Sequence, residues 1–180
     1  MELPNKKYKL VYADPPWEYS QKKVGRGYKH GAEQKYNLLS IEDIKNLGIT
    51  KITKENSVLF LWVTVPLLPY GFEVIKSWGF EYKTSLYWNK KNSLGLGNWF
   101  RNNVEQCLIG IRGNVKAFNL QIPNIIEVHP NGHSKKPKCM YPILESLDLD
   151  PKIELFARDH REGWDVYGDE LNNTMQRLIT

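Results

Sequence analysis

The chain has 180 residues, of which 41% are hydrophobic and 25% charged, so we expect one soluble globular domain over residues 1–180. No apolar run approaches the length of a membrane span, and the first residues do not form a signal peptide, which indicates an intracellular, cytoplasmic protein without a membrane partner. The formal net charge of +5 is typical of proteins with a polyanionic partner, although a moderately basic surface also occurs without one.

The first expected element is a buried strand over residues 10–13, which runs directly into Asp14, Pro15, Pro16 and Trp17. Proline has no N–H for a sheet ladder and its ring fixes φ, so the strand must end here. The carboxyl ends of strands in open α/β sheets are where ligands bind. The motif therefore predicts a carboxylate, two rigid carbonyls and an aromatic ring at a ligand site.

These residue types suit chemistry on the exocyclic amine of adenine, which is a weak nucleophile because its lone pair is delocalised into the ring. A carboxylate and a carbonyl that accept its two N–H bonds would favour an electron-rich nitrogen. An aromatic ring could stack on a base lifted out of its strand. The alternative is that Pro15 and Pro16 only end the strand and that Trp17 only fills the core. The position of Asp14 at a strand end favours the functional interpretation.

Residues 18–39 are polar, rich in glycine and lysine, and without periodicity. We interpret them as a mobile lid whose cations face phosphates; the alternative is a solvated loop. Ser40 is expected to begin a helix that ends at Gly48, with Ser40 and Asp43 forming a variant of the capping box.

A crossover unit is expected next, with a buried strand over residues 58–63, a helix over 66–78 and a strand over 81–88. Thr64 is placed to cap the helix. The succession of strand, helix and strand predicts that the two strands pair in parallel. Residues 90–103 are polar with two adjacent aromatics, and they are expected to form a second loop that faces the substrate.

Four further strands are expected, at residues 105–112, 125–128, 152–157 and 165–167. Pro137 is expected to open a helix that carries Met140 and Leu147. The alternation of elements predicts an α/β domain with a mostly parallel sheet and helices on both faces. Arg158 and His160 follow one of the strands, so they should lie at the same sheet edge as Asp14.

The two cysteines, Cys107 and Cys139, are not expected to form a disulfide in an intracellular chain. Cys107 lies in an apolar run that is typical of a buried thiol. Together with Cys139, His129 and His133 match no zinc-binding spacing, so we expect no metal site.

An ordered series of segments extends beyond the Asp-Pro-Pro-Trp (DPPW) motif, at residues 14–17, 59–64, 98–108, 113–119, 133–137 and 153–164. The series resembles the adenine-N6 methyltransferase family of the mRNA adenosine methyltransferase catalytic subunit (MT-A70-like), in its phage and bacterial DNA-adenine branch. It covers nearly the whole chain to about Leu171, which makes it far more specific than the first motif alone.

The resemblance implies a Rossmann-like methyltransferase fold and S-adenosylmethionine as the methyl donor. The catalytic residues that it implies are Asp14, Pro15, Pro16 and Trp17. The residues implied to bind the cofactor are Asp14, Lys136, Phe156, Arg158, His160, Asp169 and Glu170. The residues implied to bind the substrate are Tyr36, Trp62, Asn102, Glu105 and Lys136.

The implied reaction is methylation of N6 of adenine in nucleic acid, with DNA favoured over RNA because the compact chain resembles the phage and bacterial members. The implied location is the cytoplasm of a bacterium or of a phage-infected host. Three features depart from the family. No strand with an acidic residue precedes residues 10–13, an Asn-Gln pair of the family falls on Asp169 and Glu170, and no GxGxxG loop is present.

Two alternatives keep the fold and change the function. The substrate could be RNA adenine or cytosine N4, or the chain could be a catalytically inactive nucleic-acid-binding partner subunit. The sequence leaves open whether the protein is a monomer or a homodimer.

Overall fold

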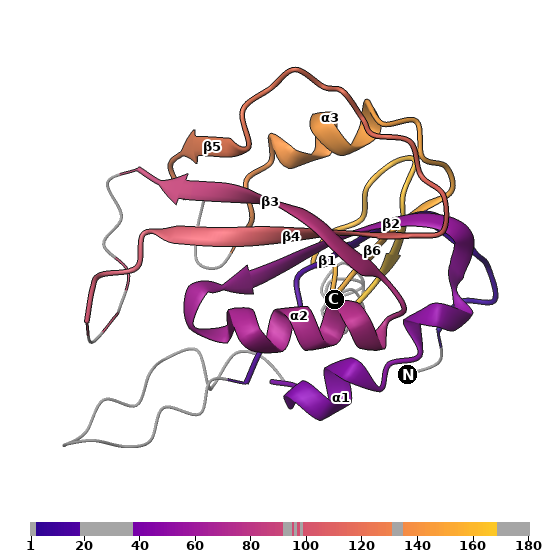
Figure 1. Ribbon diagram of the computed structural model, residues 1–180, viewed down its shortest axis with the longest axis horizontal. Coiled ribbons are helices and arrows are strands. Elements are labelled where there is room, and N and C mark those ends of the chain that lie inside the picture. Colours follow the sequence, from indigo (N-terminus) through magenta and orange to yellow (C-terminus); the bar gives the residue numbers. More distant parts are fainter. Residues whose placement is uncertain are drawn as a thin grey trace, which may run out of the picture.

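A seven-stranded sheet in the order β5-β3-β4-β2-β1-β6-β7 forms the centre of the computed structural model, which describes residues 3–18, 38–91, 95, 97, 99–130 and 135–168 (Figure 1). The strands are β1 (Tyr8–Ala13), β2 (Thr53–Thr64), β3 (Glu81–Lys90), β4 (Val104–Arg112), β5 (Ile125–Val128), β6 (Lys152–Leu155) and β7 (Asp165–Tyr167). β1 pairs in parallel with β2 and β6, as do β3 with β5 and β6 with β7, whereas β4 is antiparallel to β2 and β3. The mostly parallel sheet is confirmed.

Helices cover both faces of the sheet, as the sequence predicted (Figure 1). The α-helices are α1 (Ile41–Lys45), α2 (Leu68–Ser77) and α3 (Met140–Glu145), and 3₁₀ turns span Ile49–Lys51 and Val65–Leu67. One apolar core packs α1 and α2 on one face, and a second core packs α3 on the other. Alternate residues of β1 serve the two cores: Val11 and Ala13 belong to the first, and Leu10 and Tyr12 to the second.

The expected start of the first helix is confirmed, whereas its end was placed too late, because α1 ends at Lys45 with Asn46 as its C-cap. The Ser40 hydroxyl accepts a hydrogen bond from the backbone N–H of Asp43 at 3.1 Å, which satisfies one free donor of the first turn. Gly48, beyond the end of α1, has a φ of 70°, a left-handed conformation that side-chain-bearing residues rarely adopt.

The pairing expected for the crossover unit was wrong. β2 and β3 are not neighbours, because β4 lies between them and is antiparallel to each. The helix cap was also misassigned: a 3₁₀ turn precedes α2, and the Thr64 side chain makes no capping bond. Both errors arose because the prediction used only the local hydrophobic pattern. That pattern is the same whether or not a distant strand inserts between two others, and whether the helix begins with an α turn or a 3₁₀ turn.

Two element boundaries also differ from those expected. α3 begins at Met140 and not at Pro137, whose carbonyl instead accepts a hydrogen bond from the Met140 N–H at 3.0 Å. β6 ends at Leu155 because Phe156 has a φ of 62°, which takes the backbone out of the extended conformation. The helix expected from Leu171 lies outside the described residues.

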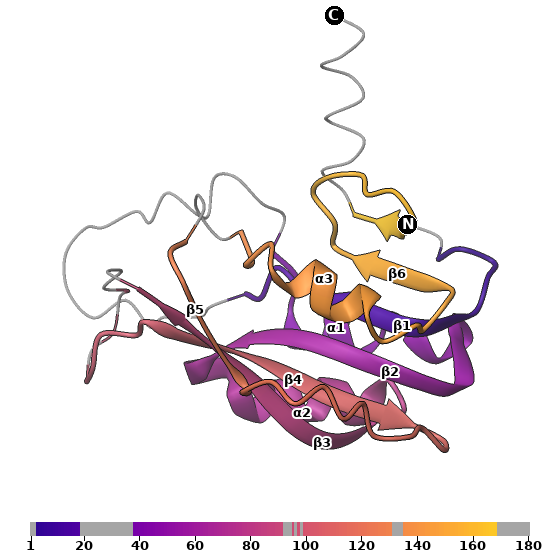
Figure 2. The same ribbon diagram turned by 90° about the horizontal axis from the view of Figure 1, so that it is seen from above.

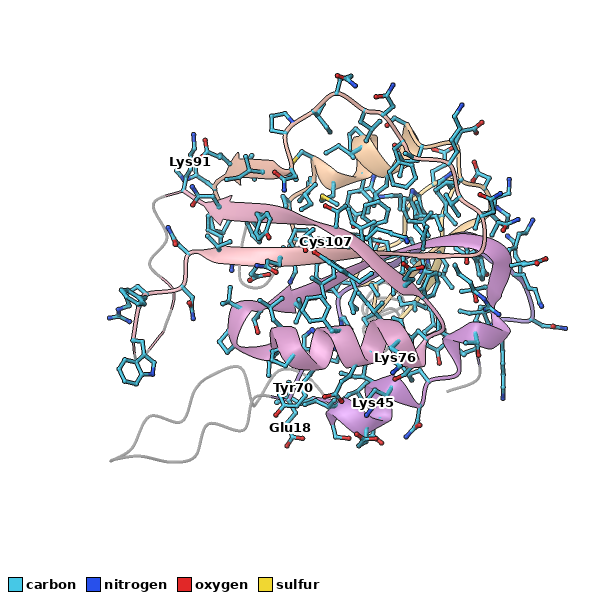
Figure 3. All side chains as sticks on the ribbon, viewed as in Figure 1. Glu18, Lys45, Tyr70, Lys76, Lys91 and Cys107 are labelled. Atoms are coloured by element: carbon cyan, nitrogen blue, oxygen red, sulfur yellow. The ribbon has the colours of Figure 1, made fainter. Side chains whose placement is uncertain are left out.

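The described part of the chain contains no helix that is long and apolar enough to cross a membrane. Cys107 is buried near the middle of the sheet, as expected, whereas Cys139 is exposed (Figure 3). Both are free thiols.

Candidate active site

Asp14 follows β1, which lies between β2 and β6 and is parallel to both (Figure 2). Ala13 is in register with Leu155, the last residue of β6, and with Leu61, three residues before the end of β2, so Asp14 lies near the carboxyl ends of three adjacent parallel strands. In sequence β1 leads to α1, which packs on one face of the sheet, and β6 follows α3, which packs on the other. The predicted common edge for Asp14 and the residues after β6 is confirmed.

A cluster of four charged side chains begins at Asp14. Lys136 Nζ lies 2.8 Å from Asp14 Oδ1 and 3.1 Å from Glu105 Oε2, and Glu105 Oε1 contacts Lys90 Nζ. Only 23%, 14% and 12% of the Asp14, Lys136 and Glu105 side chains are exposed. From Asp14 to Lys90 the charges alternate in sign and sum to zero, so each charge has an opposite neighbour.

Burial and neighbouring charges set the ionisation of this cluster. Burial raises the pKa of Asp14 above its ordinary value, and the nearby Lys136 ammonium offsets this only in part. For Glu105, burial opposes ionisation, yet Lys136 and Lys90 together hold its pKa below the ordinary value. Burial also disfavours charge on Lys136, but Asp14 and Glu105 outweigh it and raise its pKa. Lys136 is therefore a firmly charged ammonium beside a carboxylate that is comparatively easy to protonate.

Trp62 of β2 supports the site from beneath. It is fully buried, and Lys136 Nζ lies 5.7 Å from the centre of its ring. The Trp62 indole N–H donates to the Tyr12 hydroxyl at 2.8 Å, and the Trp62 carbonyl accepts from the Trp17 indole N–H at 3.0 Å. Trp62 and Trp88 pack edge to face, 6.2 Å apart. Trp62 thus joins the DPPW motif to the buried aromatic core.

The backbone of the DPPW motif is held in a tight turn. The Pro15 carbonyl accepts a hydrogen bond from the Trp17 N–H at 2.9 Å, and the Pro16 carbonyl accepts one from the Leu39 N–H at 2.9 Å. Trp17 and Leu39 also form a parallel bridge, so the two ends of the segment expected to be a lid lie side by side next to Asp14. Tyr36 lies outside the described residues.

The residues after β6 lie at the same edge of the sheet as Asp14. Phe156 is half-buried against the first core, and its left-handed backbone turns the chain away from the sheet. Arg158 is close enough for its charge to stabilise the ionised form of Asp14, and His160 is exposed. The remaining two expected cofactor contacts, Asp169 and Glu170, lie outside the described residues.

The connection from β3 to β4 lies at the same sheet edge, since Glu105 at the start of β4 is in register with Thr64 at the end of β2. Asn102 is half-buried within this connection. Trp99 and Phe100 are 94% and 85% exposed, which is unusual for adjacent large aromatic side chains.

Sequence reasoning missed two charged residues. It placed Lys90 in a surface loop, whereas Lys90 ends β3 and pairs with Glu105. It gave no role to Glu154, whose pKa burial raises to about 7, although a hydrogen bond from the Tyr141 hydroxyl favours its ionised form. Glu154 lies opposite Tyr12 of β1, and the charge of Asp14 contributes to the raised pKa. The available signal in the sequence was a charged residue within or at the end of a strand, as at Glu154 and Lys90.

Comparison with known proteins found a matching family and several related proteins. The model of the MT-A70 family matches residues 8–170. The chain is 31% identical to the Type II methyltransferase M.MunI of Mycoplasma sp, over 99% of this chain and 84% of that protein. It is 30% identical to the N(6)-adenosine-methyltransferase catalytic subunit METTL3 of Homo sapiens and to the MT-A70-like protein of Drosophila melanogaster, over 92% of this chain. The chain spans only 28% and 27% of the lengths of those two proteins.

Proposed function

Because the chain belongs to the MT-A70 family, we propose that it transfers the methyl group of S-adenosylmethionine to N6 of adenine in DNA. The observation that carries this proposal is Asp14, a carboxylate at the carboxyl end of a central parallel strand, followed by two prolines and paired with Lys136 at 2.8 Å. The relative that matches this chain over 84% of its own length is a Type II methyltransferase, and this favours DNA over RNA.

The residues at this edge fit the methyl donor. S-adenosylmethionine supplies an electrophilic methyl group on a sulfonium, and its methionine end carries one ammonium and one carboxylate. Asp14 and Lys136 present an anion and a cation side by side, both partly exposed, which is complementary to that pair of charges. We infer that Arg158 and His160, which follow β6, bind the rest of the molecule through their N–H groups.

Asp14 also provides an acceptor for the target amine. The two prolines after it have no N–H, so the motif offers this amine only acceptors. The Pro15 carbonyl already accepts the Trp17 N–H, and its second lone pair is available to the adenine. Acceptors fixed in this way stabilise the positive charge that develops on the attacking nitrogen. Trp62 contributes from below, by supporting Lys136 and the turn.

The preference for DNA is tested with DNA and RNA oligonucleotides of matched sequence, each containing adenine, in a methylation assay with labelled S-adenosylmethionine. We expect label in the DNA and little in the RNA. Preferential labelling of the RNA would overturn the DNA assignment while leaving the adenine-N6 chemistry in place.

A binding measurement separates an enzyme from an inactive partner subunit of the same fold. Calorimetric titration of the isolated chain with S-adenosylmethionine is expected to show one saturable site, weakened when Lys136 is replaced by methionine. An absence of binding by the isolated chain would favour the inactive subunit.

The exposed aromatics of the β3–β4 connection are expected to stack on substrate bases. Replacing both Trp99 and Phe100 by alanine should weaken binding to single-stranded DNA by about tenfold or more, since base stacking on an aromatic contributes about 1–3 kcal/mol per base. Fluorescence anisotropy with a labelled oligonucleotide measures this change. Phe72→Ala, at an exposed aromatic that packs on Tyr82, is the matched control. Unchanged affinity in the double variant would exclude these rings from the substrate surface.

A further inference from the structure

We propose that Lys90 is a positioning residue of the active site, which acts through Glu105 to hold Lys136 against Asp14. This proposal rests on the proposed function and adds to it a residue outside the motifs of the family resemblance. Lys90 does not reach Asp14 itself. Its effect passes through the alternating charges of the cluster.

The geometry places Lys90 firmly. Its backbone N–H donates to the Asn103 carbonyl at 2.8 Å, which fixes the end of β3 beside the start of β4. Its side chain extends over Trp88, with Nζ 4.9 Å from the ring centre, and contacts Glu105 Oε1. Trp88 is itself held by a hydrogen bond from its indole N–H to the Val128 carbonyl at 3.0 Å. Lys90 therefore has one favoured position, between a buried ring and a buried carboxylate.

Glu105 connects the two lysines with its two oxygens. One oxygen contacts Lys90 and the other lies 3.1 Å from Lys136 Nζ. Without Lys90, the Lys136 ammonium would be the only cation contacting Glu105 in the described structure, and it would be drawn from Asp14 toward Glu105. The cluster would also carry a net charge of −1 in a partly dehydrated environment, where charges interact more strongly than in water.

Burial distinguishes Lys90 from other lysines of the same region. The Lys90 and Glu105 side chains are 21% and 12% exposed. The Lys83–Glu81 pair on the same strand is 42% and 74% exposed, and the Lys91–Glu127 pair is 48% and 48% exposed. Lys91 directly follows β3, beyond the carboxyl end of the strand (Figure 3). Exposed pairs of this kind contribute little, whereas loss of one partner from a buried pair leaves an uncompensated charge.

Groups on several elements act on Asp14, and each bears on a pH measurement. Glu105 opposes its ionisation and Arg158 favours it, in addition to Lys136. Cys107 and Tyr12 are buried beside it, and burial holds the pKa of each well above its ordinary value, so both stay neutral near pH 7. The pKa of Glu154, raised to about 7 chiefly by burial, places a second titration in the working range. The effect of Lys90 on the pH dependence of activity must therefore be measured as the difference between the wild-type profile and that of a Lys90 variant.

Lys90→Met is the test, because methionine keeps the packing on Trp88 and removes the charge. Loss of a cation makes Asp14 and Glu105 easier to protonate, so the acidic limb of the kcat/KM profile should move to higher pH by about one unit. Activity should fall at neutral pH and recover in part at alkaline pH. Lys90→Arg should retain the wild-type profile, and Lys83→Met is the matched control, expected to change nothing.

Two outcomes would overturn the proposal. One is an unchanged acidic limb in Lys90→Met. The other is a raised KM for DNA with a weaker salt dependence and an unchanged kcat, which would make Lys90 a phosphate contact. If Lys90→Met does not fold, the comparison is made in Glu105→Gln, where adding Lys90→Gln should produce no further shift; a further shift would mean that Lys90 does not act through Glu105. An inactive wild-type protein would instead refute the proposed function.

Discussion

Asp14→Asn is expected to lower the rate of methyl transfer by at least about a hundredfold, since loss of one preorganised electrostatic contact at the reacting atoms costs about 10²–10³ in rate. Asparagine keeps the shape and one acceptor oxygen but removes the negative charge that, in the proposed mechanism, stabilises the attacking nitrogen. The loss should appear in kcat in single-turnover assays with saturating S-adenosylmethionine, which separates it from weaker cofactor binding.

The fold should tolerate this substitution. Burial raises the pKa of Asp14, so its ionised form is disfavoured by the folded protein, and replacement by a neutral amide removes that unfavourable contribution. Removing the Asp14 charge also takes one partner from Lys136, which keeps Glu105 Oε2 at 3.1 Å, so the free energy of unfolding at neutral pH should change little. Asp148→Asn, at an exposed aspartate with a φ of 52°, is the matched control. Residual activity above one tenth of wild type in Asp14→Asn would contradict the mechanism.

Trp62→Ala is expected to lower the free energy of unfolding by about 3–5 kcal/mol, the usual cost of truncating a buried large aromatic. The substitution would remove the ring beneath Lys136, the hydrogen bond to Tyr12 and the edge-to-face contact with Trp88. Trp62→Phe keeps most of the ring and should cost about 1 kcal/mol for the lost hydrogen bond, plus a smaller packing cost.

Urea denaturation followed by circular dichroism measures both variants. Phe100→Ala, at a side chain that is 85% exposed, is the control and should change stability by less than about 0.5 kcal/mol. A Trp62→Ala protein within about 1 kcal/mol of wild type would show that this ring does not hold the site together.

The parts of the fold that local chemistry dictates could be predicted from the sequence. The run before Asp14 is apolar and two prolines follow Asp14, so both the buried strand and its end were predictable. Ser40 likewise marked the start of α1 through its side-chain cap, whereas Gly48 lies beyond the C-cap Asn46 and precedes the 3₁₀ turn Ile49–Lys51. The insertion of β4 between β2 and β3 was not predictable, because it depends on contacts between segments distant in the sequence.

The residues of the candidate site likewise divide into those that could be predicted from the sequence and those that could not. Asp14 was identified by its place at a strand end, and Lys136 by family resemblance; the structure places their charged atoms 2.8 Å apart. Lys90 was assigned to a loop because its own neighbours in sequence are polar. Its proposed role depends on Glu105, which lies across the β3–β4 pairing and comes into contact with Lys90 only in the folded protein.

One measurement tests the central claim most directly. The purified protein is incubated with adenine-containing DNA and S-adenosylmethionine carrying a deuterated methyl group, and the digested nucleosides are analysed by mass spectrometry. The account predicts N6-methyldeoxyadenosine that carries the deuterated methyl group, formed by the wild type and nearly absent with Asp14→Asn. Label on N4 of cytosine, or no labelled nucleoside from a protein that binds S-adenosylmethionine, would contradict it.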